Sequence, residues 1–301
     1  MKATIKQMLG PSWGPRVQAV RDATYGRVAG VLAALLRNLP VRVLVRINSR
    51  LPRVMTMDYD KAPIRLWVTS LIEVTSRLNS CKKEPETVAW LEESFASGDV
   101  LYDVGANVGT YSLLAWRVSG GRGRIYSFEP GFSTFPKLCQ NLMLNGTGDT
   151  VVPLNVALSS VTGWVEFSYT SMDAGNASQG MAVDENSSKV LFKQSMPAYA
   201  MDDLQERFAL QPPTHLKIDV DGYEEAILNG AANILDSDSL RSILIEIDND
   251  EALAERVLGI LHGHGWRVVS CHPHILRGEV TVTNYVLGRD VARPSQPLCR
   301  S

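Results

Sequence analysis

The stretch at residues 99–109, Asp-Val-Leu-Tyr-Asp-Val-Gly-Ala-Asn-Val-Gly, constrains the fold more than any other part of the chain. A β-prone apolar run leads into four residues at every second position, Asp103, Gly105, Asn107 and Gly109. Helix-forming sequence then runs from Tyr111 to Val118. A strand that passes through a glycine-spaced loop into a helix brings a ligand close to bare backbone. The stretch therefore predicts a ligand site, and the alternative is a tight strand-to-helix turn that binds nothing.

Strand and helix signals alternate after this stretch, which is typical of a parallel α/β sheet. Further strands are expected at residues 124–130, 151–158, 216–220 and 242–247, and helices at 135–145, 224–231 and 252–262. Residues 266–270 and 281–287 are expected to close the chain as an antiparallel pair. A short strand at 164–169 breaks the alternation, and residues 171–189 show no periodicity. A long loop of this kind could cover the ligand and select the substrate.

The first 57 residues differ from the remainder in charge. They hold ten Lys/Arg and one acid, a net charge of +9 in a chain whose total is −2. Residues 17–47 carry a partial apolar helical stripe with interleaved arginines, and the apolar run at 28–36 is too short to span a bilayer. Such a segment can lie on an anionic membrane surface. Packing of the stripe on the domain or against a second copy is the commoner use of such a helix.

These patterns predict three parts: a basic amphipathic helical extension (1–57), a helical lead-in (58–98) and the main domain (99–301). No cleavage-site pattern follows the apolar run, so a signal peptide is not indicated. The small total charge gives no general attraction to nucleic acid. We therefore expect a cytoplasmic protein whose extension could contact the inner membrane surface.

Several of the expected strands end in acids or are followed by one, at Glu129, Asp219, Asp221 and Glu246. In an open parallel sheet, ligands bind beyond the carboxyl ends of the strands, where the strand order reverses. Glu129 lies 24 residues after Gly105, a spacing at which an acid meets ribose hydroxyls in nucleoside sites. A carboxylate can accept both hydroxyl hydrogens. The pattern favours a nucleoside without phosphate, because the third glycine of a dinucleotide fingerprint is missing.

Six motifs, taken in order, resemble the FkbM family of methyltransferases, which depend on S-adenosylmethionine (SAM). They are Asp-Val-Gly-Ala-Asn-Val-Gly (103–109), Phe-Glu-Pro (128–130), Asn-Leu-Met-Leu-Asn (141–145), Asn-Val-Ala-Leu (155–158), Met-Asp-Asp-Leu (201–204) and Leu-Lys-Ile-Asp-Val-Asp-Gly-Tyr-Glu (216–224). The resemblance covers roughly residues 80–290. It departs from the family pattern at Asp221, where glutamate is expected, and at Met201, where leucine is usual. It says nothing about the first 57 residues.

The resemblance implies a Rossmann-like class I methyltransferase sheet, mostly parallel with an antiparallel last strand. It also implies O-methylation of a sugar, glycolipid or secondary-metabolite hydroxyl. The SAM site that it implies comprises Asp103, Gly105, Ala106, Asn107 and Gly109 for the methionine part, Glu129 and Pro130 for the ribose, and Asn155, Val156 and Ala157 for the adenine. The acceptor is expected at Asp219, Asp221 and Glu224, with Lys217 and Glu246 as further contacts.

Methyl transfer from SAM requires mainly that donor and acceptor are aligned and that water is excluded. A hydroxyl acceptor also benefits from a base, and Asp219 and Asp221 would point to one face of a regular strand. Paired carboxylates can raise one pKa toward neutrality. The alternatives are that Asp221 and Gly222 form a turn and that Asp219 holds Lys217. The two aspartates and Glu246 could also converge on Mg²⁺, but such clusters are more often hydrogen-bonded structure, so no metal ligand is assigned.

Two other functions stay open at this stage. One is a nicotinamide-dependent oxidoreductase, against which the missing glycine weighs. The other is a non-catalytic SAM-fold module that binds a partner through the basic extension. The sequence names neither the acceptor nor the oligomeric state.

Overall fold

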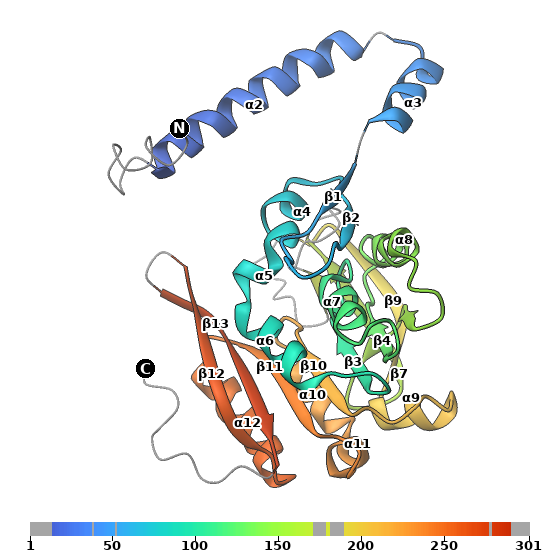
Figure 1. Cartoon of the computed structure of the whole chain (residues 1–301), viewed down its shortest axis with the longest axis vertical. Helices are drawn as coiled ribbons and strands as arrows, with labels where there is room; N and C mark the ends of the chain where they lie inside the picture. The colour runs from blue at the N-terminus through green and yellow to red at the C-terminus, as the bar shows by residue number, and fades with distance from the viewer. Residues whose placement is uncertain are drawn as a thin grey trace. The chain divides into compact units, whose positions relative to one another are not determined.

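The computed structural model of the chain describes residues 14–37, 39–51, 53–170, 179–180, 190–276 and 279–289. Its contacts divide the chain into two units, residues 1–52 and 53–301 (Figure 1). Most of the loop expected at 171–189 lies outside the described residues. The boundaries expected at residues 57 and 98 stay predictions.

The described residues of the first unit form the helices α2 (Gly14–Leu36) and α3 (Val41–Arg50). Pro40 lies directly before α3, where a missing N–H costs little because the first amides of a helix have no intrahelical acceptor. At 100° per residue, Arg42 and Arg46 share one side of α3, and Leu44 and Val45 lie on another. Across the described residues, no helix combines the length and the apolar character needed to cross a membrane.

The second unit begins with a short antiparallel pair, β1 (Val54–Thr56) and β2 (Arg65–Trp67). Four short helices follow, α4 (Leu71–Thr75), η1 (Arg77–Asn79), α5 (Ser80–Lys83) and α6 (Pro85–Ser94). A capping box starts α4, since Ser70 accepts from the amide of Glu73 and the Glu73 carboxylate accepts from the amide of Ser70. Pro85 starts α6, since its fixed φ and missing N–H suit the first helical position.

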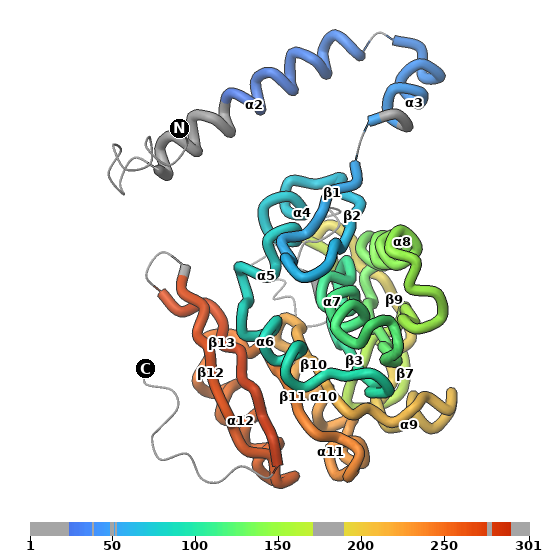
Figure 2. Tube along the Cα trace, viewed as in Figure 1, coloured from blue at the N-terminus to red at the C-terminus, as the bar shows by residue number. Residues whose placement is uncertain are grey.

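A seven-stranded sheet forms the centre of this unit, in the order β12-β13-β11-β10-β3-β4-β5. Its strands are β3 (Val100–Val104), β4 (Arg124–Phe128), β5 (Val151–Leu154), β10 (His215–Ile218), β11 (Ser242–Asp248), β12 (Arg267–Leu276) and β13 (Glu279–Gly288). The five strands from β11 to β5 are parallel, and β13 is inserted antiparallel between β11 and β12 (Figure 2). The expected Rossmann-like α/β sheet with an antiparallel last strand is confirmed.

Helices cover both faces of this sheet: α7 (Thr110–Val118), α8 (Phe135–Asn145), α9 (Met201–Arg207), α10 (Glu224–Asn229), α11 (Ala232–Asp236) and α12 (Glu251–Gly263). The buried strand β3 shows the layering, because its side chains alternate between faces. Tyr102 packs in the core formed with α9 to α12, and Leu101 packs in the core formed with α6 to α8. Burial of each such side chain contributes about 1.5–3 kcal/mol.

A second sheet has the order β6-β9-β7-β8 and lies beside the carboxyl end of β5. It comprises β6 (Ala157–Leu158), β7 (Gly163–Tyr169), β8 (Gln179–Gly180) and β9 (Phe192–Tyr199). The single strand expected at 151–158 is therefore wrong: β5 ends at Leu154, and β6 pairs with β9 instead. Asn155 makes the break, because its side-chain amide donates to the carbonyls of Glu129 (2.8 Å) and Pro130 (3.1 Å).

The closing pair is also longer than its sequence pattern indicates. Strands were expected at residues 266–270 and 281–287, but β12 extends to Leu276 and β13 begins at Glu279. The extension could not be predicted because the His272-Pro273-His274 segment lacks the apolar, β-branched residues typical of a strand. These residues pair with Asn284, Thr283 and Val282 all the same.

Candidate active site

The loop between β3 and α7 lies where the strand order reverses, since β4 pairs on one side of β3 and β10 on the other. Gly105 has a φ of 79°, and a Cβ added there would lie 1.9 Å from the carbonyl oxygen of Asp219. Only glycine therefore lets the β3 loop approach the end of β10 this closely. Asn107 also has a positive φ, 51°, which asparagine tolerates better than most residues.

The carboxylate of Glu129, directly after β4, is fixed against this loop. One oxygen accepts from the amide of Asn107 (2.9 Å), and the other accepts from the amide of Gly131 (2.8 Å). Glu129 is buried, and burial raises its pKa to about 7 although both amides favour the charged form. Each oxygen keeps a lone pair that can accept a hydroxyl hydrogen. The predicted proximity of Glu129 and the glycine loop is therefore present.

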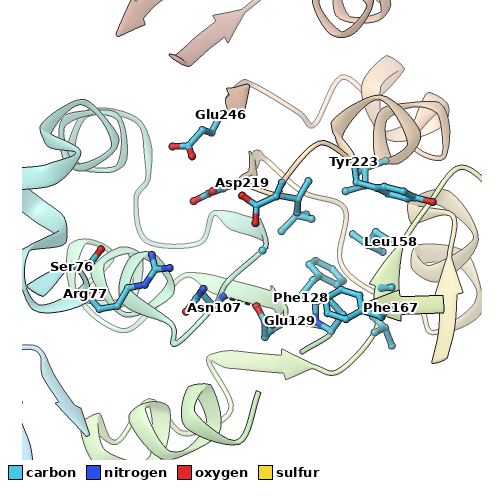
Figure 3. Close-up of a pocket in the computed structure, with 18 of the residues that line it drawn as sticks. Ser76, Arg77, Asn107, Phe128, Glu129, Leu158, Phe167, Asp219, Tyr223 and Glu246 are labelled. Atoms are coloured by element: carbon cyan, nitrogen blue, oxygen red, sulfur yellow. Dashed lines mark hydrogen bonds between the residues drawn. The ribbon is translucent and has the colours of Figure 1, made fainter. Parts of the chain in front are cut away.

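A cavity of about 220 Å³ opens beside these two elements (Figure 3). Nine of the predicted site residues line it: Gly105, Asn107, Glu129, Pro130, Val156, Ala157, Asp219, Asp221 and Glu246. Apolar side chains of Phe128, Leu158 and Phe167 lie at the Glu129 end. Acids from the ends of β10 and β11 lie at the other end. The cavity thus combines an apolar part with a charged part.

The other predicted residues lie behind the cavity wall. Asp103 is buried and accepts from the Ser112 hydroxyl, and its second oxygen has no hydrogen-bond partner among the described residues. Burial raises the pKa of Asp103. Ala106 is buried, and Gly109 has a φ of 88° and packs against Leu138 at the start of α7.

Three more predicted residues also support the cavity from outside it. Asn155 ties the chain to the end of β4, as described above. Glu224 is buried, accepts from the amide of Gly222 (3.1 Å), and has its pKa raised to about 8 by burial. Lys217 is buried beneath the cavity floor, with its ammonium 4.9 Å from the ring centre of Tyr111. The roles assigned to these residues stay predictions.

Lys217 sets the charge of Asp219. Its Nζ donates to Asp219 Oδ2 at 2.7 Å. Burial by itself would raise the pKa of Asp219, but the ammonium of Lys217 outweighs burial and holds that pKa below its usual value. Asp219 is therefore ionised at neutral pH. This is the ion pair that the sequence left open as an alternative role for Asp219.

The pKa values of the neighbouring carboxyls are shifted in the opposite direction, upward. Burial, followed by the charge of Asp219, raises the pKa of Glu246 to about 9. Asp221 is exposed at the cavity rim, where partial loss of hydration and the negative charges of Asp219 and Asp248 raise its pKa above the usual value. At neutral pH the site thus holds an ionised Asp219 beside a protonated Glu246.

Carboxylate oxygens of Glu84, Asp219 and Glu246 lie within 4.8 Å of one another, which raises the question of a metal. Lys83 donates to Glu84 at 2.7 Å, and Lys217 holds Asp219. The two ammonium groups repel a cation placed among these carboxylates and already neutralise two of them. A hard cation needs several ionised oxygen ligands, so these residues do not fit Mg²⁺ well.

Part of the cavity wall comes from a segment without any motif. Ile72, Ser76, Arg77 and Lys83 line the cavity from the short helices α4 to α5. No sequence motif indicates these four residues. Tyr223 also lines the cavity. It lies inside the 216–224 motif, so the motif could have indicated it.

Known families and proteins have sequences similar to that of this chain. The sequence model of the Methyltransferase FkbM domain matches residues 103–268, more than half of the chain. Hexuronic acid methyltransferase AglP of Haloferax volcanii is 28% identical over 183 residues, which cover 61% of this chain and 70% of that protein.

Two solved structures match the chain at low sequence identity. The methyltransferase FkbM of Methylobacillus flagellatus KT has a TM-score of 0.47 and 14% identity, over 64% of this chain and 44% of that one. Precorrin-6y C5,15-methyltransferase of Geobacter metallireducens GS-15 has a TM-score of 0.46 and 14% identity, over 74% and 93% of the two chains. The present chain thus spans less than half the length of the first of these proteins.

Proposed function

The chain belongs to the FkbM methyltransferase family, and from this premise we propose that it transfers the methyl group of SAM to a hydroxyl of a sugar. The observation that carries the proposal is the Glu129 carboxylate, fixed beside the Gly105–Asn107 loop in one cavity. A sugar is favoured over other hydroxyl compounds because the similar AglP is named a hexuronic acid methyltransferase.

The residues at one end of the cavity fit SAM. Both oxygens of Glu129 can accept from ribose hydroxyls, and the rings of Phe128 and Phe167 offer an apolar surface to the adenine. Gly105 leaves the backbone uncovered for the methionyl part. When bound, SAM supplies a methyl group on a sulfonium, which is already activated for transfer.

The residues at the other end handle the acceptor. Asp219 is ionised because of Lys217, so it can accept the proton of the attacking hydroxyl. Glu246, protonated beside it, can donate a hydrogen bond to a second sugar oxygen. Asp221, at the exposed rim, is the second candidate base. A positioned base of this kind contributes about 10²–10⁴ in rate.

Incubation of the full chain with methyl-labelled SAM and a methyl glucuronide tests the function. We expect label in the sugar and, by calorimetry, binding of S-adenosylhomocysteine (SAH) but not of NAD. Binding of NAD alone would instead support the oxidoreductase. SAH binding without label transfer to any sugar in a glycan panel would support the non-catalytic module. Mass spectrometry of glycans from cells with and without the gene would then look for a lost methyl group.

The basic extension is proposed to contact an anionic membrane surface through α3. Val41 and Val45 are exposed, and Arg42 and Arg46 lie on another side of the same helix. Each arginine near an anionic surface contributes about 1 kcal/mol. The R42Q/R46Q variant should therefore bind phosphatidylglycerol vesicles roughly 30-fold more weakly in a flotation assay.

The matched control for the vesicle assay is R207Q/R256Q, which removes two exposed arginines from the second unit. It should float like the unaltered chain. Equal binding of the unaltered chain to neutral and anionic vesicles would contradict the proposal. So would an unchanged distribution in the flotation assay after deletion of residues 1–52, which leaves the second unit intact.

A further inference from the structure

Arg77 is a cavity residue from outside the matched domain. It begins the short helix η1, ahead of residues 103–268, and is partly buried. Figure 3 shows its guanidinium directed into the cavity, toward Asn107 and Asp219. It therefore lies between the part of the cavity that fits SAM and the part that holds the acids.

The backbone that carries Arg77 is firmly anchored. The Ser80 hydroxyl donates to the carbonyl of Arg77 (2.9 Å), and Leu78 is buried in the core. The amide of Asp58 donates to the carbonyl of Leu78 at 2.9 Å. The carboxylate of Asp58 in turn accepts from the amides of Cys81 and Lys82, each at 3.0 Å. The side chain of Arg77 is thus presented from a fixed turn, which lowers the entropy cost of using it.

The positive charge of Arg77 lowers the pKa of acids at the ends of two different strands. Burial raises the pKa of Glu129 and of Asp221, and the guanidinium opposes that rise at both. It also favours the ionised form of Asp219, after the larger effects of burial and Lys217. Arg77 lines the same cavity as these three acids, so its guanidinium is within reach of a ligand bound there.

We propose that Arg77 binds a carboxylate group of a ligand in this cavity. A planar guanidinium matches a carboxylate with two parallel hydrogen bonds. The surrounding acids Glu129, Asp219 and Asp221 disfavour a polyanion such as a nucleotide phosphate, and a single small anion meets less repulsion. The proposal rests on the proposed function and names the ligand group that the segment ahead of the matched domain recognises.

Two carboxylates can reach this position, and each comes from a different molecule. One belongs to the methionyl part of SAM and SAH. The other belongs to an acidic sugar acceptor such as a glucuronide. The chemistry of recognition is the same in both cases, so the source is decided by measurement.

The test compares the unaltered full chain with Arg77→Gln by calorimetry, using SAH and 5′-methylthioadenosine. The latter keeps the adenine and ribose but has no carboxylate. If the donor is the source, the Kd for SAH should rise at least tenfold while the Kd for methylthioadenosine stays the same. Arg77→Lys keeps the charge but loses the planar guanidinium, so its Kd for SAH should lie between those of R77Q and the unaltered chain.

If the acceptor is the source, both nucleosides should bind R77Q normally. The rate of transfer to methyl glucuronide should then fall at least tenfold relative to the rate with methyl glucoside. Arg256→Gln is the matched control, because Arg256 pairs with Glu225 at the surface and does not line the cavity. It should leave every value unchanged.

The inference is overturned if R77Q binds SAH as tightly as the unaltered chain and its ratio of glucuronide to glucoside transfer rates is also unchanged. It is equally overturned if R77Q binds SAH normally and neither protein transfers label to either sugar. Failure of the proposed function looks different, because the unaltered chain would then not bind SAH at all.

Discussion

The Glu129→Gln variant should bind SAH about a hundredfold more weakly than the unaltered chain. Glu129 is held by the amides of Asn107 and Gly131, with its remaining lone pairs free for two ribose hydroxyls. A hydrogen bond to a charged group contributes about 1.5–3 kcal/mol, and each 1.4 kcal/mol is about a factor of ten in Kd. The glutamine NH₂ would also face a backbone amide that needs an acceptor. Isothermal titration calorimetry measures the change.

The pH dependence of SAH binding tests whether the Glu129 carboxylate is responsible for this affinity. Its pKa, raised to about 7 by burial, means that the carboxylate gains a proton as the pH falls through neutrality. The ionised form accepts the ribose hydroxyls, so affinity is present above this pKa and is lost below it. The Kd for SAH should rise about tenfold from pH 8 to pH 6, and E129Q should show no such change. E129Q within threefold of the unaltered chain at pH 8 would exclude the ribose contact.

The Asp219→Asn variant should lose a factor of about 10²–10⁴ in kcat while its Kd for SAH changes less than threefold. An asparagine keeps the shape of the side chain but cannot take the hydroxyl proton. The donor end of the cavity, around Glu129, is left untouched. Label transfer at saturating SAM and calorimetry with SAH provide the two readouts.

Asp221→Asn separates the two candidate bases, since it makes the same change two residues further on, at an exposed position. It should lose much less turnover than D219N. Asp219→Asn removes the 2.7 Å partner of the buried Lys217, so a thermal melt must show that the variant is folded. A folded D219N that no longer binds SAH would mean that Asp219 holds the donor. A D219N variant that keeps its turnover would remove Asp219 from the chemistry.

The sequence was most informative where the structure is local. The loop at Gly105 and the strand-end acid Glu129 are each set by residues close in the chain, and the alternation of strands and helices predicts their meeting at one sheet edge. The antiparallel insertion of β13 came instead from the family resemblance. The break between β5 and β6, where one strand was predicted over 151–158, could not be predicted because Asn155 is held by backbone carbonyls that only the fold brings near it.

Two properties of the site could not be predicted from local patterns. The wall that carries Arg77 comes from a segment without a motif, and tertiary packing alone brings it to the cavity. Which carboxyl has its pKa raised also depends on the buried lysine below the cavity. Lys217, buried under the floor, keeps Asp219 ionised and leaves the raised pKa values to Glu246 and Asp221.

The structure of the full chain in complex with SAH tests the central claim most directly. We expect the ribose hydroxyls within hydrogen-bond distance of the Glu129 carboxylate, about 2.5–3.2 Å, and the sulfur facing Asp219 across the cavity. A nucleoside bound elsewhere on the chain, or bound in the cavity with its ribose turned away from Glu129, would contradict the account.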